Sequence, residues 1–239
     1  MKKTMKNNKY IYKISCKFKD RFKKQENIPK YIIKKLIGKH SIIIEIGAND
    51  GADSLKLINI VKPKKLYCFE PHPKAIQKFK ERMKGIKNCE LFDYAISNKN
   101  GKIDFHLAEG NWNNSPMDWG SSILKPKNIT KDFPFISYEN KIKVKTITLD
   151  KWVEKHNIEK IDFMWVDIEG AEREFIQGGL ETLNKKVKYL YIEVCDKEYF
   201  EGEPTEEEIK QMLPNFKIIG KYDNNVLFEN DNKQTETFK

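Results

Sequence analysis

The feature that most constrains the fold is an alternation of short apolar runs with helical patterns in the first half of the chain. Residues 42–47 and 65–70 have the apolar character of buried strands, and residues 51–61 and 73–84 follow them with helical periodicity. Residues 89–96 form a third strand-like run. Such βαβ repetition predicts a parallel sheet with right-handed crossovers. We therefore expect an α/β domain.

The second half of the chain continues this alternation and ends differently. The strands expected there are residues 103–107, 142–148, 161–167, 188–194, 217–222 and 226–229, and the helices are residues 149–156, 171–183 and 206–212. Thr205 and Glu208 form the pattern of a capping box at the start of the last helix. The Asn-rich residues 223–225 predict a turn that joins the last two strands as an antiparallel hairpin.

Carboxylates gather where the predicted strands end. In an open α/β sheet, ligands bind beyond the carboxyl ends of the strands. The first strand runs into a glycine turn that reads EIGANDG (45–51). The acids at or just after the strand ends are Glu45, Asp50, Glu70, Asp93, Asp167, Glu169 and Glu193.

These acids favour S-adenosylmethionine over a dinucleotide as the cofactor. A dinucleotide site needs backbone amides beside a pyrophosphate, and Asp50 would bring a like charge to that place. S-adenosylmethionine has no phosphate, and it carries a sulfonium cation and a ribose diol. Glu70, about 20 residues after the first glycine, has the position that accepts hydrogen bonds from a ribose diol. We therefore expect S-adenosylmethionine rather than a dinucleotide.

Six short motifs occur in order along the chain. They are EIGANDG (45–51), FEPHP (69–73), DYAIS (93–97), the pair Ser121-Ser122, TLD (148–150) and VDIEGAE (166–172). Together they resemble the FkbM family of S-adenosylmethionine-dependent methyltransferases, over residues 41–195. The resemblance implies a Rossmann-like class I methyltransferase fold, with a mainly parallel seven-stranded sheet and a C-terminal antiparallel hairpin. The chain departs from the family pattern at Glu45, where Asp is commoner, and in residues 108–120, which form a longer loop richer in Trp.

The resemblance also implies which residues bind the cofactor. The methionine end would be lined by Glu45, Gly47, Ala48, Asn49, Asp50 and Gly51. Glu70 would hold the ribose, and Asp93 with Tyr94 and Ala95 would meet the adenine. Pro71 and Asp167 complete the expected cofactor-binding set.

The acids after the fourth predicted parallel strand are the candidates for catalysis. Methyl transfer to oxygen is an in-line displacement, and a base that removes the acceptor proton can contribute roughly 10²–10⁴-fold. We assign Asp167 as this base or as a metal ligand, and Glu169 as its partner toward the substrate or the ligand. Glu172 falls in the first turn of the next helix, where an anion is favourable, and we expect it to be mainly structural.

Two alternatives remain for the chemistry. Asp167 and Glu193 end adjacent predicted strands and could hold one Mg²⁺ or Mn²⁺ ion, which would lower the pKa of an acceptor hydroxyl. His72 and His106 are alternative candidates for the base. A histidine at either position can also be an ordinary polar residue without a catalytic role.

The polar residues 109–122 are expected to form a lid that binds the acceptor. A loop of this length in a compact domain is often a binding loop. Indole faces suit the C–H surface of a sugar ring, while hydroxyl and amide side chains reach its hydroxyls. The candidate acceptor-binding residues are Trp112, Trp119, Ser121 and Ser122. In the alternative reading, the two tryptophans only anchor the loop to the core.

The basic charge of the chain belongs to its N-terminal part. The net charge is +10, whereas residues 1–40 alone hold fourteen Lys or Arg and two acids. We expect a basic arm (1–27), a methyltransferase domain (28–230) and a C-terminal tail (231–239). The arm has Ile and Phe residues at helical spacing, so it could contact a membrane surface or a polyanion, or simply pack on the domain.

The expected function is O-methylation of a small hydroxylated acceptor, most plausibly a sugar. The chain has no apolar run of the length of a signal peptide or membrane span, and its four Cys are isolated. We therefore expect it in the cytoplasm or at the membrane surface. Two alternatives are a nucleic-acid methyltransferase and a non-catalytic membrane-surface adaptor; the first lacks basic charge in the domain itself, so we expect no nucleic-acid partner.

Overall fold

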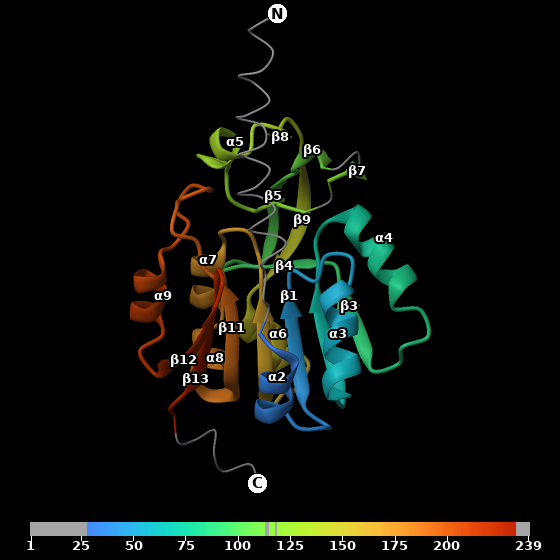
Figure 1. Ribbon diagram of the computed structural model, residues 1–239, viewed down its shortest axis with the longest axis vertical. Helices are drawn as coiled ribbons and strands as arrows, with labels where there is room; N and C mark the ends of the chain where they lie inside the picture. Colours follow the sequence, from blue (N-terminus) through green and yellow to red (C-terminus); the bar gives the residue numbers. More distant parts are fainter. Residues whose placement is uncertain (1–27, 113–114, 118, 233–239) are drawn as a thin grey trace, which may run out of the picture.

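A seven-stranded sheet lies at the centre of the protein. The structure, a computed structural model, describes residues 28–112, 115–117 and 119–232 (Figure 1). The sheet has the strand order β12-β13-β11-β10-β1-β2-β3. Its strands are β1 (Ile42–Ile46), β2 (Lys65–Phe69), β3 (Cys89–Phe92), β10 (Ile161–Val166), β11 (Val187–Glu193), β12 (Phe216–Tyr222) and β13 (Asn225–Asn230). The first five run parallel. Strand β13 pairs antiparallel with β11, and β12 pairs antiparallel with β13 to complete the hairpin. The expected α/β fold with its C-terminal hairpin is confirmed.

Helices cover both faces of this sheet, so the domain has three layers (Figure 1). One face carries α2 (Lys30–Leu36), α3 (Ala52–Val61) and α4 (Pro73–Arg82). The other face carries α6 (Leu149–Lys155), α7 (Glu172–Gly178), α8 (Leu180–Lys186) and α9 (Glu206–Met212). The last of these helices begins with the predicted capping box between Thr205 and Glu208.

Strand β1 shows why the parallel strands are apolar on both sides. Ile43 packs with the helices of the first face, whereas Ile44 and Ile46 pack with those of the second. All three side chains are buried. A sheet covered on both faces requires such continuous apolar runs, which is the pattern that predicted these strands.

The predicted single strand over residues 89–96 is wrong, because the chain leaves the central sheet at Asp93. Residues beyond it form β4 (Tyr94–Ile96), which pairs with β9 (Lys141–Ile147) in a second sheet. Strand β9 also pairs antiparallel with β5 (Gly101–His106). The Asp93 carboxylate lies at the surface, 2.7 Å from the Lys145 ammonium, so a charged side chain interrupts the apolar run at the point of separation.

The single helix predicted over residues 171–183 is in fact two helices. Helix α7 ends at Gly178, and α8 begins after Gly179. A Cβ on Gly178 would lie 2.2 Å from the backbone oxygen of Ser97. The segment after β4 therefore approaches the helix so closely that only glycine fits there.

A small subdomain covers the carboxyl ends of the parallel strands (Figure 1, top). It contains β6 (Glu109–Trp112), β7 (Ser115–Pro116), α5 (Ile129–Asp132) and β8 (Ile136–Ser137). The predicted lid over residues 109–122 thus has strands of its own. Phe133 and Phe200 belong to its apolar core, and the Lys127 amide donates a hydrogen bond to the Tyr199 carbonyl, 2.8 Å away. The subdomain is consequently fixed to the segment that follows β11.

Within these described ranges, none of the helices combines the length and the apolar character needed to cross a bilayer. The arm (1–27) and most of the expected tail (233–239) lie outside the described residues.

Candidate active site

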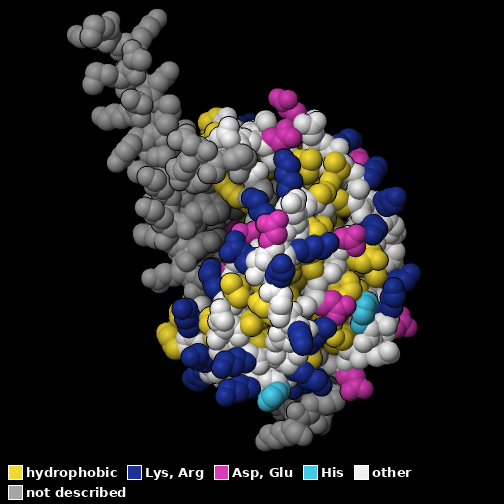
Figure 2. Space-filling view, turned by 90° about the vertical axis from the view of Figure 1, so that its right-hand side faces the viewer, with side chains coloured by type: hydrophobic (Ala, Val, Ile, Leu, Met, Phe, Trp, Pro, Cys, Tyr) yellow, Lys and Arg dark blue, Asp and Glu magenta, His cyan; other side chains and the backbone are white. Residues whose placement is uncertain are grey.

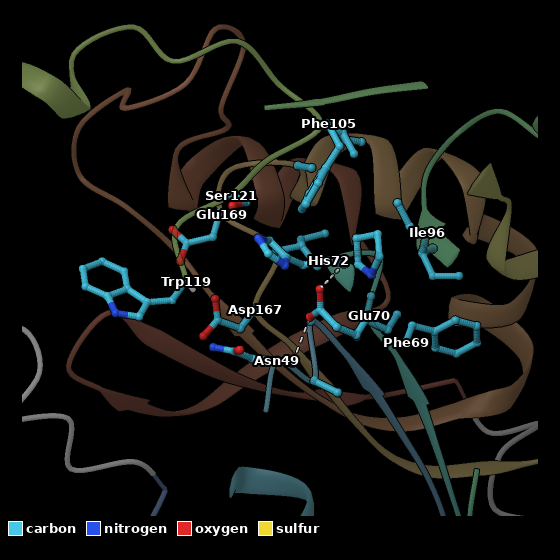
Figure 3. A pocket seen from close by; sticks show the side chains of 18 of the residues that line it. Asn49, Phe69, Glu70, His72, Ile96, Phe105, Trp119, Ser121, Asp167 and Glu169 are labelled. Carbon is cyan, nitrogen blue, oxygen red and sulfur yellow. Dashed lines mark hydrogen bonds between the residues drawn. The ribbon is translucent and has the colours of Figure 1, made fainter. Parts of the chain in front are cut away.

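A cavity of about 310 Å³ opens where β1, β2 and β10 end beneath the small subdomain (Figure 3). Its walls come from the turn after β1, the residues after β2, strand β4, the turn after β10 and residues 119–123 of the subdomain. Segments far apart in the sequence therefore meet at the sheet edge where a ligand was expected. Of the residues predicted from the sequence, Gly47, Ala48, Asn49, Asp50, Glu70, Pro71, Tyr94, Ala95, Trp119, Ser121, Asp167 and Glu169 line this cavity.

The turn after β1 owes its shape to glycine. Gly47 has φ +87°, and a Cβ built on it would lie 1.7 Å from the backbone oxygen of Asp167. Gly51 has φ +80°, and its Cβ would lie 2.8 Å from the ring of Phe79. Both positions require glycine for conformation and for space. Gly51 does not line the cavity, so its expected contact with a ligand is replaced by this packing role.

Glu70 is fixed by two backbone amides. Its Oε2 accepts a hydrogen bond from the Asn49 amide at 2.8 Å, and its Oε1 accepts one from the His72 amide at 2.7 Å (Figure 3). The residue is 6% exposed and lines the cavity. A carboxylate has about four acceptor positions, so one that holds two amides can also accept hydrogen bonds from a diol.

Asn49 supplies an independent sign that a ligand belongs here. Its Oδ1 is buried and has no hydrogen-bond partner in the part of the chain that the structure describes, although the residue lines the cavity. A buried acceptor left without a donor costs free energy, about 1–3 kcal/mol. A ligand with an ammonium or hydroxyl group would provide the donor, and S-adenosylmethionine carries both. These residues therefore fit the expected cofactor.

Glu45 does not lie where the sequence placed it. It shares the α3 face of β1 with Ile43, is 2% exposed and accepts a hydrogen bond from the hydroxyl of Ser54. The thiol of Cys68 lies 3.6 Å from it. Burial raises the pKa of Glu45 to about 8. Because strand alternation turns this side chain toward α3, it does not line the cavity, and the expected contact with the methionine end has no basis in the structure.

Asp93 also lies away from the cavity. Its carboxylate pairs with Lys145 at the surface, whereas the next residues, Tyr94 and Ala95, line the cavity with Ile96. Of the residues expected to meet the adenine, Tyr94 and Ala95 thus lie at the cavity, and Asp93 does not.

Asp167 and Glu193 lie side by side at the ends of adjacent parallel strands. Val166 pairs with Ile192, so the two acids are the next residues at the carboxyl edge. Burial raises the pKa of Asp167 well above its usual range, and the nearby carboxyls of Glu193 and Glu169 raise it further. The hydrogen bond with Glu193 acts in the same direction. Asp167 lines the cavity and Glu193 lies behind it.

Glu169 reaches the cavity through an unusual backbone conformation. Its φ is +52°, in the left-handed region that a Glu residue rarely adopts. Glu172, in contrast, is 3% exposed and does not line the cavity. Burial raises the pKa of Glu172 well above its usual range.

A metal site at Asp167 and Glu193 receives no support from the arrangement of side chains. Across the residues described, no group of three or more His, Cys, Asp or Glu side chains is arranged to hold one ion. The two acids thus remain a pair of carboxyls rather than a complete ligand set.

The subdomain brings part of the expected lid to the cavity. Trp119 and Ser121 line it, and the Ser121 hydroxyl oxygen accepts a hydrogen bond from the Ala108 amide at 3.0 Å. Ser122 is 1% exposed, and its hydroxyl oxygen accepts a hydrogen bond from the Leu124 amide, so its predicted contact with an acceptor is wrong. The backbone of Trp112 belongs to β6, but its side chain lies outside what the structure describes.

The two candidate histidines differ in position, because His72 lines the cavity and His106 does not. The Nδ1 of His72 accepts a hydrogen bond from the Lys74 amide at 3.1 Å and caps α4, so this nitrogen is already occupied within the protein. His106 does not line the cavity and forms a backbone bridge with Ser122. Burial lowers the pKa of His106.

Several lining residues escaped the sequence analysis. Asp53 lies in the first turn of α3, and Phe105 lies in β5. The alternation of residues 103–107 already put Phe105 on an apolar face, and Asp53 follows the glycine turn directly. Ile168 lies between the two predicted catalytic acids, where only polar residues had been considered.

The chain is similar to known methyltransferases in sequence and in fold. The model of the methyltransferase FkbM domain matches residues 45–222. The 2-O-methyltransferase NoeI of Sinorhizobium fredii is 36% identical over 185 residues, which are 77% of this chain and 76% of that protein. The crystal structure of methyltransferase FkbM from Methylobacillus flagellatus KT superimposes with a TM-score of 0.52 and 13% identity, over 83% of this chain and 46% of that chain. This chain thus matches less than half of that protein, and at this identity the likeness shows the fold.

Proposed function

This chain belongs to the FkbM family of methyltransferases, and we propose that it transfers the methyl group of S-adenosylmethionine to a hydroxyl of a sugar or another small hydroxylated acceptor. The observation that carries the proposal is the cavity at the strand ends, which joins Glu70 and Asp167 to Trp119 of the subdomain (Figure 3). The relative from Sinorhizobium fredii bears the name of a 2-O-methyltransferase, which supports oxygen as the methyl acceptor. S-adenosylmethionine, when bound, supplies a methyl group activated by its sulfonium charge.

Three parts of the cavity would hold the cofactor. Glu70, already oriented by the Asn49 and His72 amides, would accept hydrogen bonds from the ribose diol. Tyr94 and Ala95 would line the space for the adenine. The buried Oδ1 of Asn49 would accept a hydrogen bond from the ammonium group.

Asp167 would act as the base. Its carboxylate would take the proton of the acceptor hydroxyl while the hydroxyl oxygen forms its bond to the methyl carbon and the bond between that carbon and the cofactor sulfur breaks, which leaves S-adenosylhomocysteine. The raised pKa of Asp167 makes it a stronger base than an ordinary Asp once it is deprotonated. A neighbouring cation favours the charged form of a carboxyl group, so Asp167 loses its proton more readily beside the cofactor. Glu169 would orient the acceptor.

A sugar is the acceptor that the lining residues favour. Trp119 offers an indole face, and Ser121 offers a hydroxyl group within the same wall. Aromatic faces stack on the C–H surface of a sugar ring, and hydroxyls bind its polar edge.

The sequence also suggests a divalent ion at Asp167 and Glu193, but the described residues place no third ligating side chain with this pair, so the proposed transfer includes no metal step. Activity that is lost with a chelator and restored by Mn²⁺ would overturn this part of the proposal, and full activity after chelation would support it.

The basic N-terminal part would bind an anionic membrane surface or another polyanion. Residues 1–40 hold fourteen of the 45 Lys and Arg of the chain. Within α2, Lys30, Lys34 and Lys35 are exposed, and Tyr31 is 70% exposed beside them. Binding of the full chain to vesicles that contain phosphatidylglycerol, and not to vesicles of phosphatidylcholine alone, would support this contact.

The test of the function is a transfer assay with mass detection. The full chain is incubated with S-adenosylmethionine and a panel of neutral glycosides. We expect S-adenosylhomocysteine and a glycoside heavier by one methyl group, and no such product with Asp167→Asn. If the protein binds the cofactor and methylates no hydroxylated compound, the proposal is wrong.

A further inference from the structure

The cavity is lined by acids without basic side chains. The described lining residues include no Lys and no Arg. The carboxyl groups among them are those of Asp50, Asp53, Glu70, Asp167 and Glu169. A ligand that enters this cavity therefore meets carboxyl groups and no Lys or Arg side chain among the described lining residues.

At one end of the cavity, the negative charges of the acids are balanced by ion pairs and backbone amides. Asp50 forms an ion pair with Arg82, and Asp53 pairs with Lys56 at 2.7 Å. Glu70 accepts two backbone amides, as described above. The negative charge at the end formed by β1 and β2 is thus balanced by groups of the protein itself.

The other end collects acids. Figure 3 shows Asp167 and Glu169 close to Trp119, on the opposite side of the cavity from Glu70 and His72. The carboxyls that act on Asp167 there include those of Glu193 and Glu172. Whatever is bound beside Trp119 therefore lies next to several carboxyl groups.

Glu169 lines this end of the cavity although its backbone has an unfavourable left-handed conformation. Its φ of +52° is unfavourable for Glu, and Gly170 follows with φ +95°. A Cβ on Gly170 would lie 3.0 Å from the ring of Phe200, so the turn is packed against the segment after β11. The backbone turn that carries Glu169 is consequently packed against this segment.

We propose that this end of the cavity selects acceptors by charge, and that Glu169 is the residue that determines the selection. It admits hydroxylated acceptors that are uncharged or carry an ammonium group, such as neutral sugars and amino sugars. It rejects acceptors that carry a carboxylate or phosphate near the reacting hydroxyl. The inference rests on the proposed function, and it counts against a nucleic-acid acceptor, whose phosphates would meet the same acids.

Three matched glycosides test the selection. The nitrophenyl glycosides of galactose, galactosamine and galacturonic acid have the same ring and differ in charge. Methyl transfer is measured as kcat/KM for each, and binding to the chain saturated with S-adenosylhomocysteine is measured by saturation-transfer NMR. The variants are Glu169→Gln, which keeps the size of the side chain, and Glu159→Gln, which removes an exposed acid away from the cavity.

We expect the neutral and amino glycosides to be preferred over the galacturonide by about tenfold or more. Glu169→Gln should reduce this preference to less than about threefold, whereas Glu159→Gln should leave it unchanged. Equal use of the galacturonide, an unchanged preference in Glu169→Gln, or no binding of the neutral and amino glycosides would overturn the inference. If preferential binding is seen without any methyl transfer, the charge selection stands and the proposed O-methylation fails.

Discussion

Gly47 lies directly against the backbone of Asp167, so that a Cβ at Gly47 would come within 1.7 Å of the Asp167 carbonyl oxygen. This contact joins the ends of β1 and β10, which pair in parallel up to Ile46 and Val166. The turn expected to hold the cofactor and the acid expected to act as base are therefore positioned by one close approach of two backbones.

Gly47→Ala should disrupt that approach. The methyl group would force the two strand ends apart, and at φ +87° an L-residue is itself unfavourable by about 1–2 kcal/mol. We expect a lower Tm and loss of S-adenosylhomocysteine binding by calorimetry. Gly85→Ala is a matched control, because Gly85 has φ +85° but no atom within 4 Å of its Cβ position. Equal effects of the two substitutions would show that the contact with Asp167 is unimportant.

The pH dependence of methyl transfer should show that Glu193 raises the pKa of Asp167. A base acts only when it is deprotonated, and burial and Glu193 raise the pKa of Asp167. Activity should therefore fall on acidification at a pH well above the usual range of an Asp. Glu193→Gln removes a charge that raises this pKa, so the acid limb of the kcat/KM profile should move to lower pH. Asp167→Asn should lower kcat by roughly 10²–10⁴-fold. An acid limb that does not move in Glu193→Gln would contradict the pairing.

Glu45 should make the stability of the protein depend on pH. Its folded pKa of about 8 is above the ordinary Glu value of 4.5, so its favourable contribution to the free energy of unfolding is complete below the unfolded pKa and is lost as pH rises toward the folded pKa. Each pH unit in this window corresponds to about 1.4 kcal/mol. In urea unfolding, Glu45→Gln should gain roughly 3 kcal/mol relative to the natural chain between pH 5.5 and pH 8. Identical pH slopes for the two chains would show that Glu45 is not buried in this way.

Trp119 should serve the acceptor and not the cofactor. Trp119→Ala should raise KM for a glycoside about tenfold, since an aromatic contact contributes roughly 0.5–1.5 kcal/mol beyond its buried area. The Kd of S-adenosylhomocysteine should remain within about twofold, because the indole lies on the other side of the cavity from Glu70 (Figure 3). If the indole only anchors the subdomain, Trp119→Ala will lower Tm and leave KM unchanged.

The surface of the domain offers a simple contrast with the cavity. Lys and Arg side chains are scattered widely over the face seen in Figure 2, with acids between them. The lining of the cavity has acids and no Lys or Arg among its described residues. The overall charge of the chain therefore says nothing about the charge that a ligand meets, and the basic residues do not make this cavity suitable for phosphate.

The sequence predicted the sheet and much of the cavity because both depend on short-range patterns. Gly47 and Glu70 follow apolar runs directly, so their place at the strand ends was readable. Glu45 and Asp93 are predicted ligand contacts because the family resemblance implies them and because they belong to motifs at strand ends. Which way each side chain faces depends on strand alternation and on what covers each face: α3 covers Glu45, and Lys145 attracts Asp93 to the surface.

The acceptor side could be predicted only in part, because it depends on contacts between distant segments. The break between α7 and α8 reflects the approach of Ser97 to Gly178, which no local pattern contains. Similarly, Ser121 lines the cavity and Ser122 does not, because Ser122 itself forms a backbone bridge with His106. Neighbouring identical residues in a sequence can thus have different roles once the chain is folded.

Calorimetric titration with S-adenosylhomocysteine and, separately, with a nicotinamide dinucleotide tests the central claim most directly. Glu70 accepts hydrogen bonds from the amides of Asn49 and His72 and lines the cavity. The central claim is that its carboxylate binds the ribose diol of a cofactor that has no pyrophosphate. We expect binding of S-adenosylhomocysteine, about tenfold or more weaker binding in Glu70→Gln, and no binding of the dinucleotide. Binding of the dinucleotide, or S-adenosylhomocysteine binding that is unchanged in Glu70→Gln, would contradict it.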